Sequence, residues 1–296
     1  MSTGAVAHPL VTYSRMIKLS HSIFAMPFAL AAAALAARDV PVTWEQMALV
    51  VLCMVLARSS AMGFNRVVDR DIDAANPRTA GREIPSGQIS VRAAWGFTLG
   101  SAGAFVLCCA LLGQTVLWLS PVALAIIWGY SLAKRYTALC HVVLGAALAL
   151  APTGVWIALT DGYGWVPCIL SLAVGSWVAG FDIIYSCQDA GFDKGRGLHS
   201  IPAALGLRGA LIVSALLHVG TVGALLALPM VAPLGPAYFA GVLIIAGVLV
   251  YEHWIVRPDD LSRIDKAFFD LNGYVSLAFF AFVALGLWAP APLGIG

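Results

Sequence analysis

The sequence predicts an all-α, polytopic membrane protein, and three observations support this prediction. The composition is 60% hydrophobic and only 11% charged, with a mean hydropathy of +0.88. A soluble domain carries about 25% charged residues. The apolar residues also gather in runs close to the ~20 residues with which an α-helix crosses a bilayer. Finally, Lys and Arg residues collect in alternate segments between these runs.

Nine apolar runs predict nine transmembrane helices. Their centres lie near residues 30, 53, 102, 123, 149, 174, 220, 245 and 278. If the N-terminus is inside, every Lys and Arg except Arg38 falls on the inner side. The positive-inside rule therefore predicts an N-in, C-out orientation. The net charge of +2 gives no indication of a nucleic-acid partner.

Two acidic motifs close the second and the sixth predicted helices. Residues 65–73 read NRVVDRDID, and residues 185–193 read YSCQDAGFD. The two motifs align with the same spacing of i, i+4 and i+8. On a helix this spacing forms one stripe whose neighbours lie ~6 Å apart. The aligned residues are Asn65 with Tyr185, Asp69 with Asp189, and Asp73 with Asp193.

The distance between the motifs predicts an internal repeat. They are four predicted helices apart, and an even number of spans leaves both on the same side of the membrane. We therefore expect two four-helix repeats arranged in a ring, with one extra helix. A single domain then covers residues 1–296, with repeat halves at approximately 15–135 and 136–256. The ninth helix is expected at approximately 265–290.

The acids and the nearby bases together indicate a diphosphate site. Like charges at i, i+4 destabilise a helix, so two matched acidic stripes point to a function. Carboxylate oxygens suit Mg²⁺, and the expected metal ligands are Asp69, Asp73, Asp189 and Asp193. Basic residues follow on the same side, in the loops after helices two, four and six, and they suit phosphate. These are Arg78, Arg82, Lys134, Arg135, Lys194 and Arg196.

Four segments of the chain carry a family resemblance. Residues 65–87, NRVVDRDIDAANPRTAGREIPSG, and residues 185–206, YSCQDAGFDKGRGLHSIPAALG, match the two aspartate-rich motifs with their loops. Residues 130–145 (YSLAKRYTALCHVVLG) and 15–30 (RMIKLSHSIFAMPFAL) match a loop and an N-terminal helix. Together they resemble the UbiA superfamily of intramembrane aromatic prenyltransferases, over most of the chain.

The details of the motifs resemble the quinone-biosynthesis branch of this superfamily. Position 66 is Arg where many members have Asp, and residues 83–84 are Glu-Ile where Pro-Leu is common. The Asn-Arg form, the REIP segment and the SHSIFAMPF-like start resemble a subgroup linked to quinone synthesis. This subgroup includes members that serve the futalosine route to menaquinone.

The resemblance implies a Mg²⁺-dependent transfer of a polyprenyl group from polyprenyl diphosphate to a small aromatic acceptor. The acceptor would be of the 4-hydroxybenzoate or dihydroxynaphthoate type, in ubiquinone or menaquinone biosynthesis. The four aspartates would hold Mg²⁺, and Tyr185 would offer its ring to the allylic carbocation. Arg82, Lys134 and Lys194 are the first choices for phosphate contacts. Asn65, Arg78, Arg135 and Arg196 are expected to assist at the diphosphate.

The acceptor end is predicted near the start of the first helix. Lys18 is expected to hold an acceptor carboxylate, with His21 and Tyr130 nearby. A snorkelling Lys and a structurally satisfied His are the alternatives. Asp182 lies about two helical turns before Asp189, which indicates a supporting role. The histidines beside the motif loops, His141 and His199, are weaker candidates.

The expected location is a bacterial inner membrane, with the site on the cytoplasmic side and the isoprenoid tail in an apolar tunnel open to lipid. One alternative is a UbiA-type transferase with a non-quinone acceptor, such as haem, chlorophyll or a glycerol phosphate lipid. A second alternative is a CDP-alcohol phosphatidyltransferase. Such enzymes carry a sequence that resembles Asp-Gly-x-x-Ala-Arg, and this sequence lacks it. A secondary transporter would carry its acids near the bilayer midplane, in broken helices.

Overall fold

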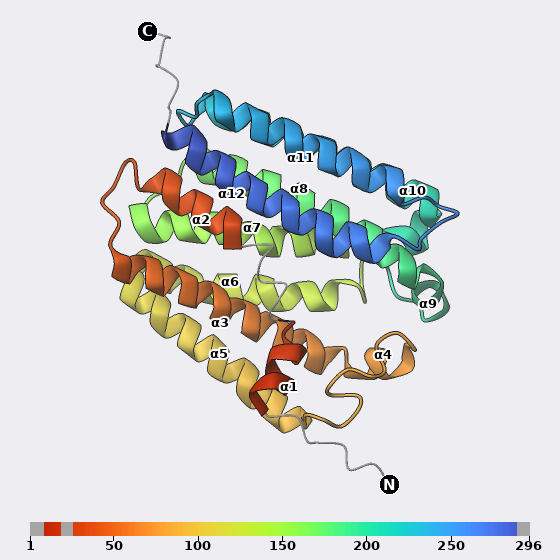
Figure 1. Cartoon of the computed structure of the whole chain (residues 1–296). Helices are drawn as coiled ribbons and strands as arrows, with labels where there is room; N and C mark the ends of the chain where they lie inside the picture. The colour runs from red at the N-terminus through yellow and green to blue at the C-terminus, as the bar shows by residue number, and fades with distance from the viewer. Residues whose placement is uncertain (1–8, 19–25, 289–296) are drawn as a thin grey trace.

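Helices form the framework of the part of the chain that the structure describes (Figure 1). The computed structural model describes residues 9–18 and 26–288. Within these residues the β-type pairing consists of one isolated bridge, between Arg257 and Asp260. The short helices are α1 (Pro9–Met16), α2 (Met26–Ala36), α4 (Arg70–Ala75) and α9 (Ala190–Gly195). The long helices are α3 (Trp44–Val68), α5 (Val91–Leu112), α6 (Gln114–Ala133), α7 (Cys140–Thr160), α8 (Trp165–Ser186), α10 (Ile201–Ala227), α11 (Pro236–Ile255) and α12 (Asn272–Trp288).

Eight helices in the described part of the chain are long and apolar enough to cross a membrane. They correspond to the second to ninth predicted spans. The predicted first span is represented by α2, which is apolar but has only 11 residues. At 1.5 Å per residue, such a helix covers roughly half of a 30 Å hydrocarbon core. The prediction of nine full-length spans is therefore not confirmed.

Polar side chains start several of the long helices. Thr43 and Gln46 form a capping box at α3, in which each side chain accepts a hydrogen bond from the other residue's backbone N–H. At the starts of α5 and α10, the side-chain oxygens of Ser90 and Ser200 each accept one hydrogen bond from a backbone N–H of the first turn. These caps satisfy backbone donors that the first turn of a helix leaves unpaired.

The helices pack in two groups that meet along α7 (Figure 1). In one group α3 lies against α5 and α6, and in the other α8 lies against α10, with α11 and α12 paired beyond it. α6 connects the groups by packing on α7, and α7 packs closely on α8. α2 lies against α7 and α12, so this early helix packs on elements from later in the chain.

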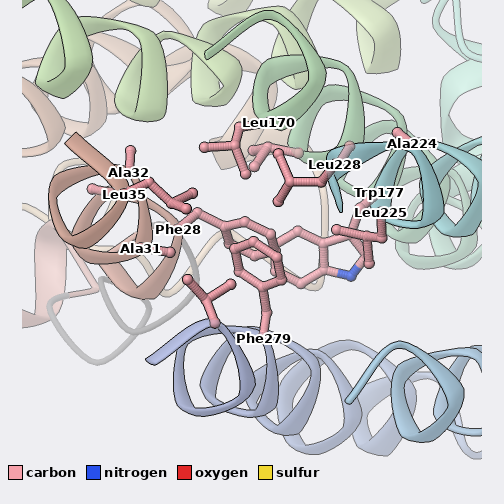
Figure 2. Packing of buried hydrophobic residues seen from close by; sticks show 14 of the residues in the cluster. Phe28, Ala31, Ala32, Leu35, Leu170, Trp177, Ala224, Leu225, Leu228 and Phe279 are labelled. Carbon is pink, nitrogen blue, oxygen red and sulfur yellow. The ribbon is translucent and has the colours of Figure 1, made fainter. Parts of the chain in front are cut away.

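The main core lies where α2, α8 and α12 meet (Figure 2). The ring of Phe28 stacks on Phe279, with centroids 4.5 Å apart, and lies 5.0 Å from the ring of Trp177. All three side chains are almost completely buried. The Trp177 Nε1 atom donates to Asn272 Oδ1 over 2.7 Å, which satisfies the one polar atom of this aromatic cluster.

Candidate functional site

Both aspartate motifs turn away from their long helix at the first aspartate. Asp69 has φ −93° and ψ 4°, and it separates α3 from the short helix α4. Asp189 has φ −100° and ψ 2°, and it closes the 3₁₀ turn Cys187–Asp189 before α9. The matching backbone supports the alignment of the two motifs. The prediction of one continuous helical stripe is wrong, because a ψ near 0° departs from helical geometry at each first aspartate.

Each of the four aligned aspartates, Asp69, Asp73, Asp189 and Asp193, is paired with one base. Buried carboxylates cost several kcal/mol to desolvate unless a partner offsets the charge. The side chain of Asp193 is 0% exposed, and that of Asp73 is 7% exposed. The pairs are Asp69 with Arg135 (3.2 Å), Asp73 with Arg82 (2.6 and 2.7 Å), Asp189 with Arg78, and Asp193 with Lys134 (2.8 Å).

These pairs join the two halves of the chain. Arg78 follows the first motif, but it binds Asp189 of the second motif through Nε (3.0 Å) and Nη2. Asn76 donates from Nδ2 to the same carboxylate over 3.1 Å. The loop after α6 contributes to both motifs, since Lys134 binds the second motif and Arg135 binds the first. The site is therefore assembled from three loops that are far apart in the sequence.

Neutral side chains also donate hydrogen bonds to the motif carboxylates. Asn65 donates from Nδ2 to Asp69 Oδ2 over 2.9 Å, and Ser200 donates from Oγ to Asp193 Oδ2 over 2.9 Å. Burial raises the pKa of Asp69 above its usual value, and this effect exceeds the opposing hydrogen bond from Arg135. A second cation close to Asp69 would therefore favour its charged form.

The donor set of the motifs fits Mg²⁺ in its chemistry, because it consists of carboxylate and amide oxygens. The assignment of Asp69, Asp73, Asp189 and Asp193 as metal ligands stays a prediction. In the part of the chain that the structure describes, no three His, Cys, Asp or Glu side chains form a group that could hold a metal ion. Each of the four aligned carboxylates is instead paired with a base.

A mainly apolar cavity of about 420 Å³ begins beside the motifs and runs between α3, α5, α6, α7 and α8. Its polar end includes Asn65 and Arg82 of the first motif region, and Tyr185 of the second. Its other end is lined by Val50, Cys53, Leu112 and Val116. Along α3 the lining residues extend over about four turns, or roughly 24 Å. This space fits a long apolar chain whose polar head lies at the motifs.

Tyr185 lies where the polar and apolar parts of the cavity meet. Its hydroxyl is bonded to Arg78 Nη1 over 3.0 Å, and the Arg78 guanidinium carbon lies 5.2 Å from the ring centroid. The ring of Phe268 is 4.1 Å from that of Tyr185 and also lines the cavity. Phe268 belongs to a π-helical turn, Lys266–Leu271, a rare element that often occurs at functional sites.

Of the three residues predicted to bind the acceptor, the structure describes two. Lys18 lines the cavity, as does Tyr130, whereas His21 lies outside the described residues. Arg58 donates to the Lys18 carbonyl over 3.3 Å, and Arg66 donates to the Met16 carbonyl over 3.2 Å. Burial, followed by the charges of four nearby guanidinium groups, lowers the pKa of Lys18 to about 8; these groups are Arg66, Arg82, Arg78 and Arg58.

Two of the predicted phosphate ligands form no ion pair with a motif aspartate in the described residues. Lys194 and Arg196 are exposed, and neither lines the cavity. Arg196 instead lies over the ring of Phe192, at 5.7 Å. In the described residues the aspartates are paired by Arg78, Arg82, Lys134 and Arg135. A role for Lys194 and Arg196 stays a prediction.

Sequence reasoning missed four polar residues of the site. Asn76 and Ser200 hold motif carboxylates, and Arg58 and Arg66 line the cavity. Arg58 carried a usable signal, because a cation inside an apolar run has a function more often than not. Asn76 and Ser200 carried none, since their roles depend on contacts with residues more than one turn away.

The fold and the site together define a polytopic intramembrane enzyme whose acid–base site opens into an apolar tunnel. A profile of the UbiA prenyltransferase family matches residues 25–283. The chain therefore belongs to the UbiA prenyltransferase family and is a transferase of prenyl groups.

Named relatives and solved structures agree with this assignment. The 4-hydroxybenzoate octaprenyltransferase of Salmonella paratyphi C is 30% identical over 243 residues, which cover 82% of this chain and 83% of the relative. The enzyme of the same name from Vibrio campbellii is 27% identical, over 86% of this chain and 88% of the relative.

Among solved structures, the apo UbiA homolog from Aeropyrum pernix K1 has a TM-score of 0.82 and 33% identity, covering 90% of this chain and 98% of that one. A UbiA homolog from Archaeoglobus fulgidus, solved with DMAPP and Mg²⁺, has a TM-score of 0.75. It is 18% identical, over 94% of this chain and 99% of that one, so it is similar in fold alone.

Proposed function

We propose that the protein transfers a polyprenyl group from polyprenyl diphosphate to a carbon of a small aromatic acceptor, with Mg²⁺ as cofactor and release of diphosphate. The acceptor is of the 4-hydroxybenzoate or dihydroxynaphthoate type, and the product enters ubiquinone or menaquinone biosynthesis. The observation that supports this most directly is the set of four acid–base pairs at the mouth of an apolar cavity.

The motif residues divide the work at the diphosphate. Asp69, Asp73, Asp189 and Asp193 would hold Mg²⁺, which when bound supplies Lewis-acid stabilisation of the leaving group. When the donor binds, the bases that pair with the aspartates also face its diphosphate, and they can bind phosphate oxygens as well as carboxylates. Fixed charges aimed at a leaving diphosphate lower the barrier to breaking the allylic C–O bond. These bases are Arg78, Arg82, Lys134 and Arg135.

The cavity has two tasks in this reaction. Its apolar walls hold the isoprenoid chain and keep water from the allylic cation, which water would otherwise quench. The ring of Tyr185 lies beside a guanidinium group, and the same ring can stabilise a carbocation. Tyr185 therefore acts at the point where the diphosphate end of the cavity becomes apolar.

Positive charge at the cavity wall supports an acidic acceptor. Lys18, Arg58 and Arg66 all line the cavity, and Arg66 is 3% exposed. A carboxylate on the acceptor ring would pair with one or two of them and hold the ring beside the donor. This charge favours benzoate-like or naphthoate-like acceptors over a neutral lipid.

The site is proposed to face the cytoplasm of a bacterial inner membrane, because all Lys and Arg residues except Arg38 lie on its side of the predicted spans. Exposed positions on opposite sides test this orientation: Ser86 in the loop after the first motif and Asp39 after α2. In intact cells a membrane-impermeant maleimide should label Asp39→Cys. Ser86→Cys should react only after permeabilisation, and the unsubstituted protein gives the background from native cysteines. The reverse pattern would contradict the proposed orientation.

The function is tested with purified protein, Mg²⁺, geranyl diphosphate and three acceptors: 4-hydroxybenzoate, 1,4-dihydroxy-6-naphthoate and 1,4-dihydroxy-2-naphthoate. We expect a prenylated product with one of them, and a loss of roughly 100-fold or more in Asp69→Ala and Asp189→Ala, since each removes a fixed charge at the leaving group. Asp71→Ala is the matched control, because Asp71 is in the same motif but its side chain is 83% exposed and paired with Arg70.

The outcomes separate the alternatives. Mg²⁺-dependent donor binding without product from any acceptor would indicate a non-quinone acceptor. Equal activity of Asp69→Ala and Asp71→Ala would contradict the role given to the motif.

A further inference from the structure

Asp182 is the one acidic residue among the side chains that line the main cavity in the described part of the chain. The other charged lining residues are cations, and the four motif aspartates lie outside the lining. The Asp182 side chain is 24% exposed, so it is accessible from the cavity without being solvated like a surface acid. The diphosphate chemistry proposed above leaves this carboxylate without a task.

The position of Asp182 on α8 places it beyond the diphosphate end. It lies three residues before Tyr185, and residues at this spacing are neighbours on one helix face, with ~5–6 Å between Cβ atoms. It lies seven residues, or about two turns, before Asp189. Moving into the cavity along α8, the order is motif aspartate, Tyr185 and then Asp182. The carboxylate therefore borders the space in which a donor carbon and an acceptor ring would meet.

His141 holds Asp182 in a defined orientation. Its Nδ1 atom is 2.7 Å from Asp182 Oδ2, and the His141 side chain is 3% exposed. The backbone N–H of Ile201 donates to His141 Nε2 over 3.3 Å. An Nε2 atom that accepts a hydrogen bond leaves the proton on Nδ1, so His141 is the donor to Asp182. In the described residues no other side chain bonds to this carboxylate, which leaves Oδ1 available.

We propose that Asp182, oriented by His141, accepts the proton that the acceptor ring loses during prenyl transfer. The allylic C–O bond breaks, and its electron pair leaves with the diphosphate. A π-electron pair of the ring forms the new C–C bond to the allylic carbon. The proton on the substituted ring carbon then passes to Asp182, the C–H pair restores aromaticity, and the carboxyl group later releases the proton to water.

The chemistry of the other lining residues supports this assignment. Lys18, Arg58, Arg66 and Arg82 are cations when they bind anions, and they cannot accept a proton in that state. The hydroxyl groups of Tyr130 and Tyr185 are weak bases at neutral pH. A carboxylate is the one lining group with a free electron pair suited to the task, and His141 keeps it in place without neutralising it. In this account His141 is a positioning residue.

The test follows product formation by Asp182→Asn with an acceptor deuterated at the substituted ring carbon, together with Mg²⁺-dependent binding of geranyl diphosphate. General-base catalysis contributes roughly 10²–10⁴-fold, so we expect kcat to fall by at least about 100-fold. Donor affinity should stay within about twofold, since Asp182 does not touch the diphosphate in this account. A primary kinetic isotope effect should appear in the variant, because proton loss becomes rate-limiting.

Variants of His141 test the positioning role separately and cover the case in which Asp182→Asn does not fold. His141→Ala should lower kcat and bring out the same isotope effect, with donor binding retained. His141→Gln offers a donor for Asp182 and an acceptor for the Ile201 N–H, so it should restore most of kcat. A merely structural role for His141 would change protein yield or donor binding without changing the isotope effect.

Two results would overturn the inference. One is a kcat in Asp182→Asn close to that of the unsubstituted protein. The other is a loss of activity that accompanies lost donor binding and shows no isotope effect in either variant, which would assign Asp182 to the diphosphate or to folding. The inference rests on the proposed function, and failure of that function is distinguishable. It would appear as an unsubstituted protein that forms no product from any acceptor.

Discussion

At the scale of single residues, the site is governed by charge balance in a poorly hydrated place. Each motif carboxylate is offset by one base, and the buried Asp193 also receives a hydrogen bond from Ser200. Lys18 is largely buried, and this burial is the main cause of its low pKa; four nearby guanidinium groups lower the pKa as well, and no carboxylate in the described residues pairs with it. An anion that enters the cavity should therefore bind most strongly near Lys18.

Lys18 gives the reaction a defined pH dependence. The pKa of Lys18 is about 8, below the usual 10.5 of lysine, so the side chain is charged below pH 8 and becomes neutral as the pH rises through that value. If it binds the acceptor carboxylate, the KM for the acceptor should rise above about pH 8, by up to ~10-fold per pH unit. The measurement is the acceptor KM between pH 6.5 and 9.5.

Lys18→Arg is the control for this prediction, because a guanidinium group stays charged throughout this range. Its acceptor KM should show no rise near pH 8, and Lys18→Met should bind the acceptor weakly at every pH. Coincident profiles for Lys18→Arg and the unsubstituted protein would remove Lys18 from the acceptor site.

At the scale of helices, small residues decide how closely two elements approach. A Cβ atom added at Gly145 of α7 would collide with the backbone carbonyl oxygen of Gly175 on α8. Close backbone contact of this kind is a common way for helices to associate in membranes, where no hydrophobic force joins them. The α7–α8 contact also positions His141 and Asp182, which come from these two helices.

Gly145→Ala should therefore destabilise the protein. We expect a loss of about 1–3 kcal/mol in the free energy of unfolding, because the two helices must separate to admit the methyl group. The measurement is thermal unfolding in detergent, with the midpoint compared to that of the unsubstituted protein.

Gly103→Ala on α5 is a matched control. An added Cβ there meets no described atom within 4 Å, and Ala favours a helix interior by roughly 0.5–1 kcal/mol over Gly. Its midpoint should be unchanged or higher. If both variants unfold at the same temperature, the close approach of α7 and α8 does not limit stability.

At the scale of the whole molecule, the cavity is a joint product of both helix groups. α3, α5 and α6 supply one wall, while α7 and α8 supply the other. Ala151 of α7 lines it eleven residues after the helix begins, or roughly 16 Å along the axis. The depth available to an isoprenoid chain therefore depends on how the two groups pack against each other.

Ala151→Phe should shorten the donors that the enzyme accepts. The added ring fills the tunnel beyond its polar end, and overpacking costs about 1–3 kcal/mol, so kcat/KM for long polyprenyl diphosphates should fall by roughly 10-fold or more. The values for dimethylallyl and geranyl diphosphate should change little. The measurement is kcat/KM across a series of donor lengths.

Leu172→Phe on α8 serves as the comparison, since Leu172 is 61% exposed on the outer surface and does not line the cavity. It should leave the length preference unchanged. A uniform loss for all donors in Ala151→Phe would indicate that the chain does not follow this tunnel.

The local sequence pattern by itself determined the positions of the long helices and the residue types of the site. The apolar runs predicted the eight long helices at their observed places, because burial in a bilayer requires apolar stretches of helical length. The paired motifs indicated an acid–base site, and the four bases that pair with the aspartates were all among the predicted phosphate ligands. The matched backbone at Asp69 and Asp189 agrees with the alignment of the motifs. The motif spacing did not reveal the turn at each first aspartate.

Only the tertiary structure decided which acidic side chain pairs with which basic side chain. Arg78 and Asp189 are 111 residues apart, and no local rule pairs them. The same is true of His141 with Asp182, and of the exposed places of Lys194 and Arg196. The physical reason is that helix formation depends on neighbours along the chain, whereas the partner of a buried charge depends on which loops the packed helices bring together.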